Sequence, residues 1–293
     1  MKIGFVGLGA MGLPMAKRLL AHGHTVLGHD LGTHNRAAFE AAGGHWQADA
    51  AGVVQGIDVL WLMVVSGDQA QTFLLTNQHA DGLAANATVI VSCTQAASQA
   101  AALAEALSAK GLHMLDAPVS GGVVGAESGN LSVMVGGPSA VLEAVKPILD
   151  LVGKNVFHMG ERCGMGSTMK MVNQLLCGVH IAVGAEALHL AQNAGLQAQQ
   201  VLDIIGVSAG NSWMFANRGP RMIQDEPEVA SAVDIFVKDL SIVTDEARKL
   251  KTGLPLASSA LQMFLAASGQ GHGKADDSQV IRAYRGMNRS DKT

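Results

Sequence analysis

Near its start the chain reads Val6-Gly7-Leu8-Gly9-Ala10-Met11-Gly12, between a strand-like run at residues 3–6 and a helical periodicity over residues 13–20. In this context the GxGxxG spacing predicts a dinucleotide-binding turn. The first two glycines permit a tight turn and close approach of the backbone to a pyrophosphate, and the third lets the helix pack on the strand. The amides of the helix N-terminus favour a bound anion. We therefore expect dinucleotide contacts from the turn residues Gly7, Leu8, Gly9, Ala10, Met11 and Gly12.

An acidic residue closes the next predicted strand, at residues 25–30. Asp30 lies 21 residues after Gly9, which matches the roughly 20-residue spacing of the carboxylate that binds the adenosine ribose hydroxyls. A carboxylate there repels a 2′-phosphate, so the sequence favours NAD over NADP. Two features oppose this interpretation. Arg36 could fold back toward a phosphate, and an aspartate that closes a strand is also common in turns.

Strands and helices alternate as far as about residue 158. Apolar runs at residues 58–65, 88–92 and 112–115 are typical of strands buried on both faces, and an alanine-rich helical segment spans residues 97–110. Repeated strand–helix units predict an α/β fold with a Rossmann-type, doubly wound parallel sheet, which gathers ligands at the carboxyl ends of its strands. The residues that follow those ends include Val64, Val65, Thr94 and the segment 116–122.

Ser120-Gly121-Gly122 lies in the last of these segments and combines a hydroxyl with flexible backbone amides. Such a nest can hold a carboxylate without a dedicated arginine. An ordinary tight turn would use the same residues.

A glycine-rich stretch at residues 160–166 marks the predicted domain boundary, and helix follows helix beyond it. We expect a nucleotide-binding domain at residues 1–162 and an all-α substrate-binding and oligomerisation domain at residues 163–293. A long interdomain helix, residues 165–194, would join them and run about 45 Å at 1.5 Å per residue.

A lysine lies near the start of that helix. Lys170 is the one cation in residues 164–176, and the i+3, i+4 spacing places Asn173 and Gln174 on its helical face. A lysine in an apolar surface loses solvation, unless it reaches water from the helix end. A desolvated lysine can have its pKa lowered toward neutrality, which makes Lys170 a candidate general base.

Other polar features allow two interpretations each. Residues 211–218 concentrate aromatic and amide side chains and would line a pocket or belong to the core. Lys238 lies in an apolar stretch beside Asp239, where a local ion pair explains it almost as well as function does. The histidines do not form HExxH or a comparable cluster, so we expect no metal site.

Composition excludes several classes of protein. A net charge of −4 over 293 residues, with no basic cluster, argues against a nucleic-acid partner or an anionic membrane surface. The longest apolar run, Val59 to Val65, is far shorter than the roughly 18 residues that a membrane span needs. The first strand begins directly after Met1-Lys2, which leaves no room for a signal peptide and favours a cytoplasmic location. The three cysteines lack CxxC spacing and predict free thiols.

Four motifs together resemble the β-hydroxyacid dehydrogenase family, which includes 3-hydroxyisobutyrate dehydrogenase and tartronate semialdehyde reductase. They are GFVGLGAMGLPMA at residues 4–16, DAPVSGG at 116–122, GMGSTMKMVNQLL at 164–176 and FVKDL at 236–240. The resemblance implies that Lys170 is the catalytic lysine, that Ser120, Gly121 and Gly122 bind substrate, and that Lys238 contacts the cofactor. It also implies cofactor contacts at Val64, Val65 and Thr94. Many members have asparagine four residues after the catalytic lysine, where this chain has Gln174, so either Asn173 or Gln174 contacts the substrate.

Within the family, residues 63–70, 174–188, 210–218 and 231–240 resemble the members that oxidise the C2 hydroxyl of L-threonate to a 2-oxo acid with NAD. The alternatives are reduction of tartronate semialdehyde, oxidation of 3-hydroxyisobutyrate and, from another class, a non-catalytic dinucleotide-binding sensor. A sensor has no reason to keep Lys170 beside two amides. The apolar helical domain also predicts a homodimer or homotetramer.

Overall fold

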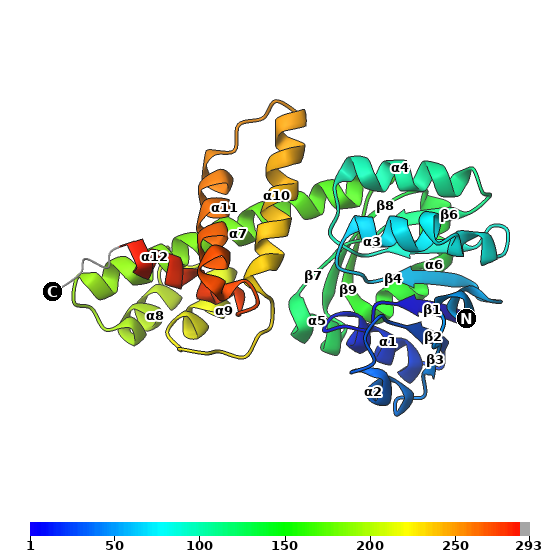
Figure 1. Cartoon of the computed structure of the whole chain (residues 1–293), viewed down its shortest axis with the longest axis horizontal. Coiled ribbons are helices and arrows are strands. Elements are labelled where there is room, and N and C mark those ends of the chain that lie inside the picture. Colours follow the sequence, from blue (N-terminus) through cyan, green and yellow to red (C-terminus); the bar gives the residue numbers. More distant parts are fainter. Residues whose placement is uncertain (288–293) are drawn as a thin grey trace. The chain divides into compact units, whose positions relative to one another are not determined.

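In the computed structural model of the chain, residues 1–287 are described. They form two compact units, one ending at Lys170 and the other beginning at Met171 (Figure 1). The first unit is an α/β structure and the second consists of helices, as the sequence predicts.

One sheet organises the first unit, with strand order β3-β2-β1-β4-β5-β6-β8-β7 and with β9 beside β8. Strands β1 to β6 pair in parallel, which confirms the doubly wound parallel sheet. The strands are β1 Lys2–Val6, β2 Thr25–His29, β3 His45–Trp46, β4 Val59–Leu62, β5 Thr88–Val91, β6 His113–Asp116, β7 Val119–Ser120, β8 Leu131–Gly136 and β9 Gly153–Gly160.

Alternating side chains of these strands enter two separate cores, one on each face of the sheet. Phe5 and Trp61 pack into one core, while Val6 and Leu62 pack into the other. This explains why the strands read as continuous apolar runs, because both faces are covered by helices. Helices α1 (Gly12–Ala21) and α6 (Ser139–Val152) contribute to the first core, and α4 (Ala97–Ser108) contributes to the second.

Shorter helical segments complete the first unit. They are α2 Arg36–Glu40, α3 Gly67–Gln71 and α5 Gly122–Ser128, the 3-10 segments Ala50–Val54 and His79–Gly82, and the π segment Thr72–Thr76.

The end of the sheet departs from the parallel pairing of strands β1 to β6. Strand β8 runs antiparallel to both β6 and β7, and only β9 restores a parallel pair. The connection from β7 to β8 covers only residues 121–130, including α5, which is shorter than the dozen or more residues that a parallel crossover needs.

The second unit contains most of helix α7 (Met165–Asn193), whose predicted bounds, residues 165–194, are confirmed to within one residue. The other helices are α8 Ala198–Gly206, α9 Trp213–Met222, α10 Val233–Lys249, α11 Pro255–Ala267 and α12 Ile281–Met287, with a π segment at Ser268–His272 and a 3-10 segment at Asp277–Val280. Ile181 and Leu188 of α7 pack with Phe236 and Phe264 in the core of this unit.

Candidate active site

The glycine turn connects β1 to α1. Gly7 has a φ of +92°, in the left-handed region, and a Cβ added there would overlap the carbonyl oxygen of Met63. A Cβ at Gly12 would overlap the carbonyl oxygen of Gly7, so the third glycine lets the helix pack on the strand. Gly9 faces open space. Met11, at the N-cap position, has no side chain that could cap α1, so the first amides of the helix and the open backbone at Gly9 fit a pyrophosphate.

Asp30 follows β2 and is held by the backbone of the same turn. Its Oδ2 accepts a hydrogen bond from the amide of Leu8 at 2.6 Å, and its Oδ1 accepts one from the amide of Gly32 at 2.9 Å. Asn35 donates its Nδ2 to the carbonyl oxygen of Leu8 at 2.7 Å. The carboxylate is therefore fixed beside the turn, where a ribose hydroxyl could reach it.

Arg36, which the sequence leaves as a possible phosphate ligand, is engaged elsewhere. Its Nε lies 3.0 Å from Glu40 Oε1, and its guanidinium lies 6.0 Å from the centre of the Trp46 ring. In the structure the guanidinium of Arg36 therefore lies against α2 and the ring of Trp46 in β3.

Val64, Val65 and Thr94 follow β4 and β5 at the edge of the sheet that also carries the glycine turn, because β1, β4 and β5 are parallel neighbours. Val65 is 55% exposed, and its amide donates to Gln69 Oε1 at 2.9 Å. The fold therefore brings these predicted cofactor residues to one edge, as the sequence predicts.

Ser120, Gly121 and Gly122 lie between β7 and α5. Gly121 has a φ of +135° and Gly122 a φ of +64°, so both adopt backbone conformations that favour glycine. Gly122 faces open space. This geometry suits a backbone nest for an anion.

Asp116, at the end of β6, is a residue whose importance the sequence reasoning missed. It is fully buried; its Oδ2 accepts hydrogen bonds from the amides of Gly164 at 2.9 Å and Ser167 at 2.7 Å, and its Oδ1 accepts one from Ser167 Oγ at 2.6 Å. Burial raises the pKa of this carboxyl, and the hydrogen bonds from Ser167 oppose that shift. Asp116 therefore caps the first turn of α7 and fastens it to the sheet.

Lys170 lies three residues beyond Ser167 on α7 and is 8% exposed. The lysine is buried, so it does not reach into solvent from the helix end. The capped first turn fixes the backbone from which the Lys170 side chain extends.

Asn173 and Gln174 belong to a chain of polar contacts in the second unit. Asn173 donates Nδ2 to Gln174 Oε1 at 2.9 Å, and Gln174 donates Nε2 to Asp239 Oδ2 at 2.5 Å. Lys238 Nζ lies 2.7 Å from Asp239 Oδ1, so the local ion pair that the sequence suggests is present. Gln174 and Asp239 are buried, at 7% and 2% exposure.

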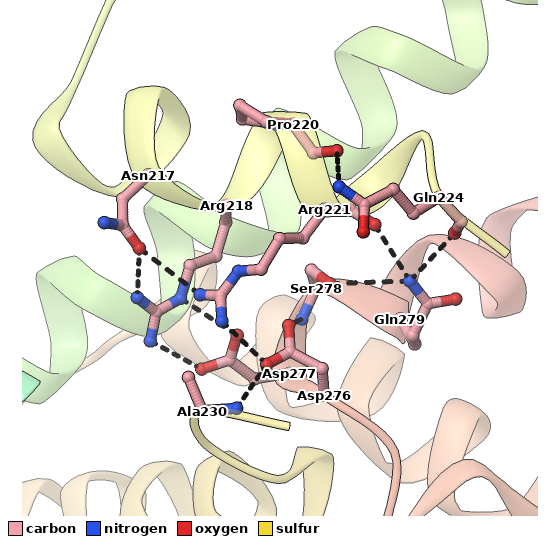
Figure 2. Close-up of polar contacts among 10 residues, drawn as sticks. All are labelled: Asn217, Arg218, Pro220, Arg221, Gln224, Ala230, Asp276, Asp277, Ser278 and Gln279. Atoms are coloured by element: carbon pink, nitrogen blue, oxygen red, sulfur yellow. Dashed lines mark hydrogen bonds and ion pairs between the residues drawn. The ribbon is translucent and has the colours of Figure 1, made fainter. Parts of the chain in front are cut away.

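The polar residues of 211–218 serve the architecture of the second unit. Arg218 forms two hydrogen bonds of 2.9 Å with the buried Asp277, and Arg221 pairs with the buried Asp276 at 2.9 Å (Figure 2). Asn217 Oδ1 accepts hydrogen bonds from both guanidinium groups. These pairs join α9 to the 3-10 segment Asp277–Val280 and to Asp276, which precedes it. The sequence reasoning missed them, because the partners lie more than 50 residues apart.

Metal ligands do not gather in residues 1–287: this part of the chain contains no group of three or more His, Cys, Asp or Glu side chains that could hold an ion.

Comparison with protein families matches two models to the chain. Residues 2–160 match the NAD binding domain of 6-phosphogluconate dehydrogenase, and residues 164–284 match the NAD-binding region of NADP-dependent 3-hydroxyisobutyrate dehydrogenase.

Individual relatives extend over nearly the whole chain. An L-threonate dehydrogenase from Escherichia coli O6:H1 is 43% identical, over 97% of this chain and 95% of its own. A 2-(hydroxymethyl)glutarate dehydrogenase from Eubacterium barkeri is 35% identical, over 98% of this chain and 95% of its own. Among solved structures, a 3-hydroxyisobutyrate dehydrogenase from Salmonella typhimurium is 43% identical and superposes with a TM-score of 0.91, covering 96% of this chain and 99% of that chain.

Proposed function

Because the chain belongs to the β-hydroxyacid dehydrogenase family, we propose that it oxidises the C2 hydroxyl of L-threonate to the 2-oxo acid 2-dehydro-L-erythronate with NAD. The observation that carries this proposal is the 41–43% identity to L-threonate dehydrogenases over 97% of the chain. The chain is a dehydrogenase with NAD(P)-binding domains that acts on a small molecule, so the sensor alternative does not apply.

The bound nicotinamide supplies the hydride acceptor for this reaction. Lys170 Nζ takes the proton of the C2 hydroxyl as the C2–H bond breaks and the carbonyl forms, and it returns that proton in the reverse direction. The Ser120–Gly122 amides hold the substrate carboxylate and orient C2, and Asn173 or Gln174 orients a hydroxyl. The burial of Lys170 supports its role, because an exposed ammonium would keep its proton near neutral pH.

The cofactor contacts that we propose are Gly7 to Gly12, Asp30, Val64, Val65, Thr94 and Lys238. Asp30 supports NAD over NADP, since its carboxylate is fixed where a 2′-phosphate would be repelled and Arg36 is paired with Glu40. We assign nucleotide binding to residues 1–162, and substrate binding and oligomerisation to residues 163–293.

A homodimer or homotetramer is supported by an exposed apolar row on α7. Val172, Leu176, Val183 and Leu190 are between 45% and 69% exposed and recur at helical spacing. Within residues 1–287, α7 is also long and apolar enough to span a membrane, a test that the core helix of a soluble protein passes equally. We propose that a second copy covers this row, that the enzyme is cytoplasmic, and that it binds neither membranes nor nucleic acid.

The test is NAD reduction measured over a panel of three- and four-carbon hydroxy acids. We expect L-threonate to give the highest kcat/KM. A higher value for 3-hydroxyisobutyrate would support the second candidate function, which the similarity to the Salmonella typhimurium structure favours. Lys170→Met should abolish turnover without changing the thermal unfolding midpoint substantially, and near-normal turnover would remove Lys170 from the mechanism.

A further inference from the structure

The polar contacts of the second unit form a hydrogen-bond relay with a fixed direction. We define the relay as Lys238, Asp239, Gln174 and Asn173. An ionised carboxylate only accepts hydrogen bonds, so Gln174 must turn its amide nitrogen toward Asp239. Its Oε1 then faces Asn173, which must donate its own amide nitrogen.

The direction of the relay also fixes the orientation of the Asn173 amide. Asn173 Nδ2 donates to Gln174 Oε1 at 2.9 Å and to Cys177 Sγ at 3.5 Å, so the protein engages its amide nitrogen. What Asn173 can offer a ligand is its carbonyl oxygen. Asn173 is partly exposed, whereas Gln174 is buried at 7% exposure.

An acceptor at this position has a specific use in the proposed reaction. Lys170 lies on the same helix, three residues earlier. The reacting hydroxyl has a single hydrogen, and the reaction delivers it to Lys170. A neighbouring acceptor therefore serves a different hydroxyl of the substrate.

We propose, on the basis of the proposed function, that Asn173 Oδ1 accepts a hydrogen bond from a second hydroxyl beside the reacting one, and that Asp239 is the positioning residue that keeps this oxygen turned outward. The site then selects 2,3-dihydroxy acids over acids that lack the C3 hydroxyl. A site built to pair with a hydroxyl rejects the analogue that lacks it, because its polar group is left unpaired.

Asp239→Asn tests the direction of the relay. The new asparagine can turn its oxygen to Lys238 and its nitrogen to Gln174, so Gln174 and Asn173 can both reverse while each donor still meets an acceptor. Asn173 would then present a nitrogen, to which the C3 hydroxyl can only act as acceptor, so the hydrogen of that hydroxyl loses the acceptor that Asn173 Oδ1 provides. We expect the ratio of kcat/KM for L-threonate to that for its 3-deoxy analogue, 2,4-dihydroxybutanoate, to fall by at least about 10-fold.

Two features of this assay separate positioning from general damage. Any effect of the substitution on the cofactor through Lys238 lowers kcat/KM for both substrates alike, so it cancels in the ratio. The matched control is Asp245→Asn on the same helix, where an exposed aspartate pairs with Arg248 at 2.9 Å. We expect the control to keep the wild-type ratio and Asp239→Asn to unfold within about 2 °C of it. Where turnover of the analogue is too slow, its inhibition constant against L-threonate replaces kcat/KM.

Asn173→Asp provides a test that needs no substrate. The new carboxylate cannot donate to Gln174, so two acceptors must face each other. Either the carboxylate faces Gln174 Oε1, or Gln174 reverses and turns that oxygen toward Asp239. We expect the unfolding midpoint to fall by about 2–4 °C or more. Adding Asp239→Asn to Asn173→Asp lets every donor meet an acceptor again, and should recover at least half of the loss.

An unchanged substrate ratio in Asp239→Asn would overturn the inference, and so would an absence of recovery in the double variant. Wild-type enzyme that is inactive on L-threonate contradicts the proposed function instead, and the unfolding experiment still tests the relay in that case.

Discussion

Replacing Asp116 by alanine would remove the acceptor for three donors at the start of α7, namely the amides of Gly164 and Ser167 and the hydroxyl of Ser167. Ser167 is 1% exposed, so water cannot replace its lost bonds. Each buried donor left unpaired costs about 1–3 kcal/mol. Removal of a buried carboxylate, whose pKa is raised by burial, offsets part of that cost. We expect a net loss of about 3 kcal/mol in the free energy of unfolding.

Two milder substitutions separate the contributions of the individual hydrogen bonds to stability. Asp116→Asn can still accept both amides with its carbonyl oxygen and can donate its nitrogen to the Ser167 hydroxyl, so it should lose at most about 1 kcal/mol at neutral pH. Ser167→Ala removes the hydroxyl contact alone, with a similar loss of about 1 kcal/mol. Chemical denaturation gives all three values.

The pH dependence of Asp116→Asn has a definite sign. The pKa of Asp116 is raised in the folded protein, so its contribution to stability is greatest below the unfolded pKa and is lost as pH rises through the folded pKa. Asparagine does not titrate. The free energy of unfolding of Asp116→Asn minus that of the wild type should therefore increase as the pH rises above about 4, the pKa of an unfolded aspartate.

Catalytic activity should depend on the capped first turn of α7, because Lys170 lies about one helical turn after Ser167. We expect Asp116→Ala to lower kcat by about 10- to 100-fold while still folded, and Asp116→Asn to stay within a few-fold of the wild type. The control is Asp58→Ala, which removes one exposed contact, with the amide of Lys2 at 2.8 Å. Equal effects of Asp116→Ala and Asp58→Ala on stability and kcat would refute the reasoning.

Three further substitutions test other parts of the account. Asp30→Asn removes the carboxylate that repels a 2′-phosphate, so the ratio of kcat/KM with NAD to that with NADP should fall by at least about 10-fold, and a constant ratio contradicts the assignment. Gly7→Ala places a side chain at a φ of +92° against Met63, and should weaken NAD binding in calorimetry by at least about 10-fold; Gly23→Ala, at a φ of +80° in open space, is the control for backbone strain alone. Arg218→Met leaves the buried Asp277 carboxylate without its main partner and should lower the free energy of unfolding by about 3–5 kcal/mol, whereas a loss below about 1 kcal/mol, as expected for an exposed pair, would contradict it.

The features that the sequence predicts well are encoded locally. The glycine turn, the strand before it and the helix after it lie within 20 residues, and the apolar runs of β4 and β5 show burial on both faces without reference to any partner. Asp30 could be found because its distance from the turn is fixed by one strand–helix–strand unit. Helix α7 could be predicted almost to the residue, since its sequence is largely apolar and free of proline from one end to the other, despite internal glycines.

The features that the sequence does not predict depend on distant partners. In the sequence, Asp116 is simply an acidic residue at the end of a strand. Only its contacts with Ser167, 51 residues later, show that it caps α7. The separate roles that we propose for Asn173 and Gln174 could not be found locally, because they depend on Asp239, which lies 65 residues beyond Gln174. The direction of β8 likewise follows from the reversal through α5, which apolar periodicity does not record.

The most direct test of the account follows the hydrogen at C2. Wild-type enzyme is incubated with NAD and L-threonate deuterated at C2, and mass spectrometry locates the label. We predict that the deuterium appears in the reduced cofactor, that the product is the 2-oxo acid, and that Lys170→Met abolishes the transfer. Reduced cofactor without deuterium, accompanied by a product oxidised at C3 or C4, would contradict it.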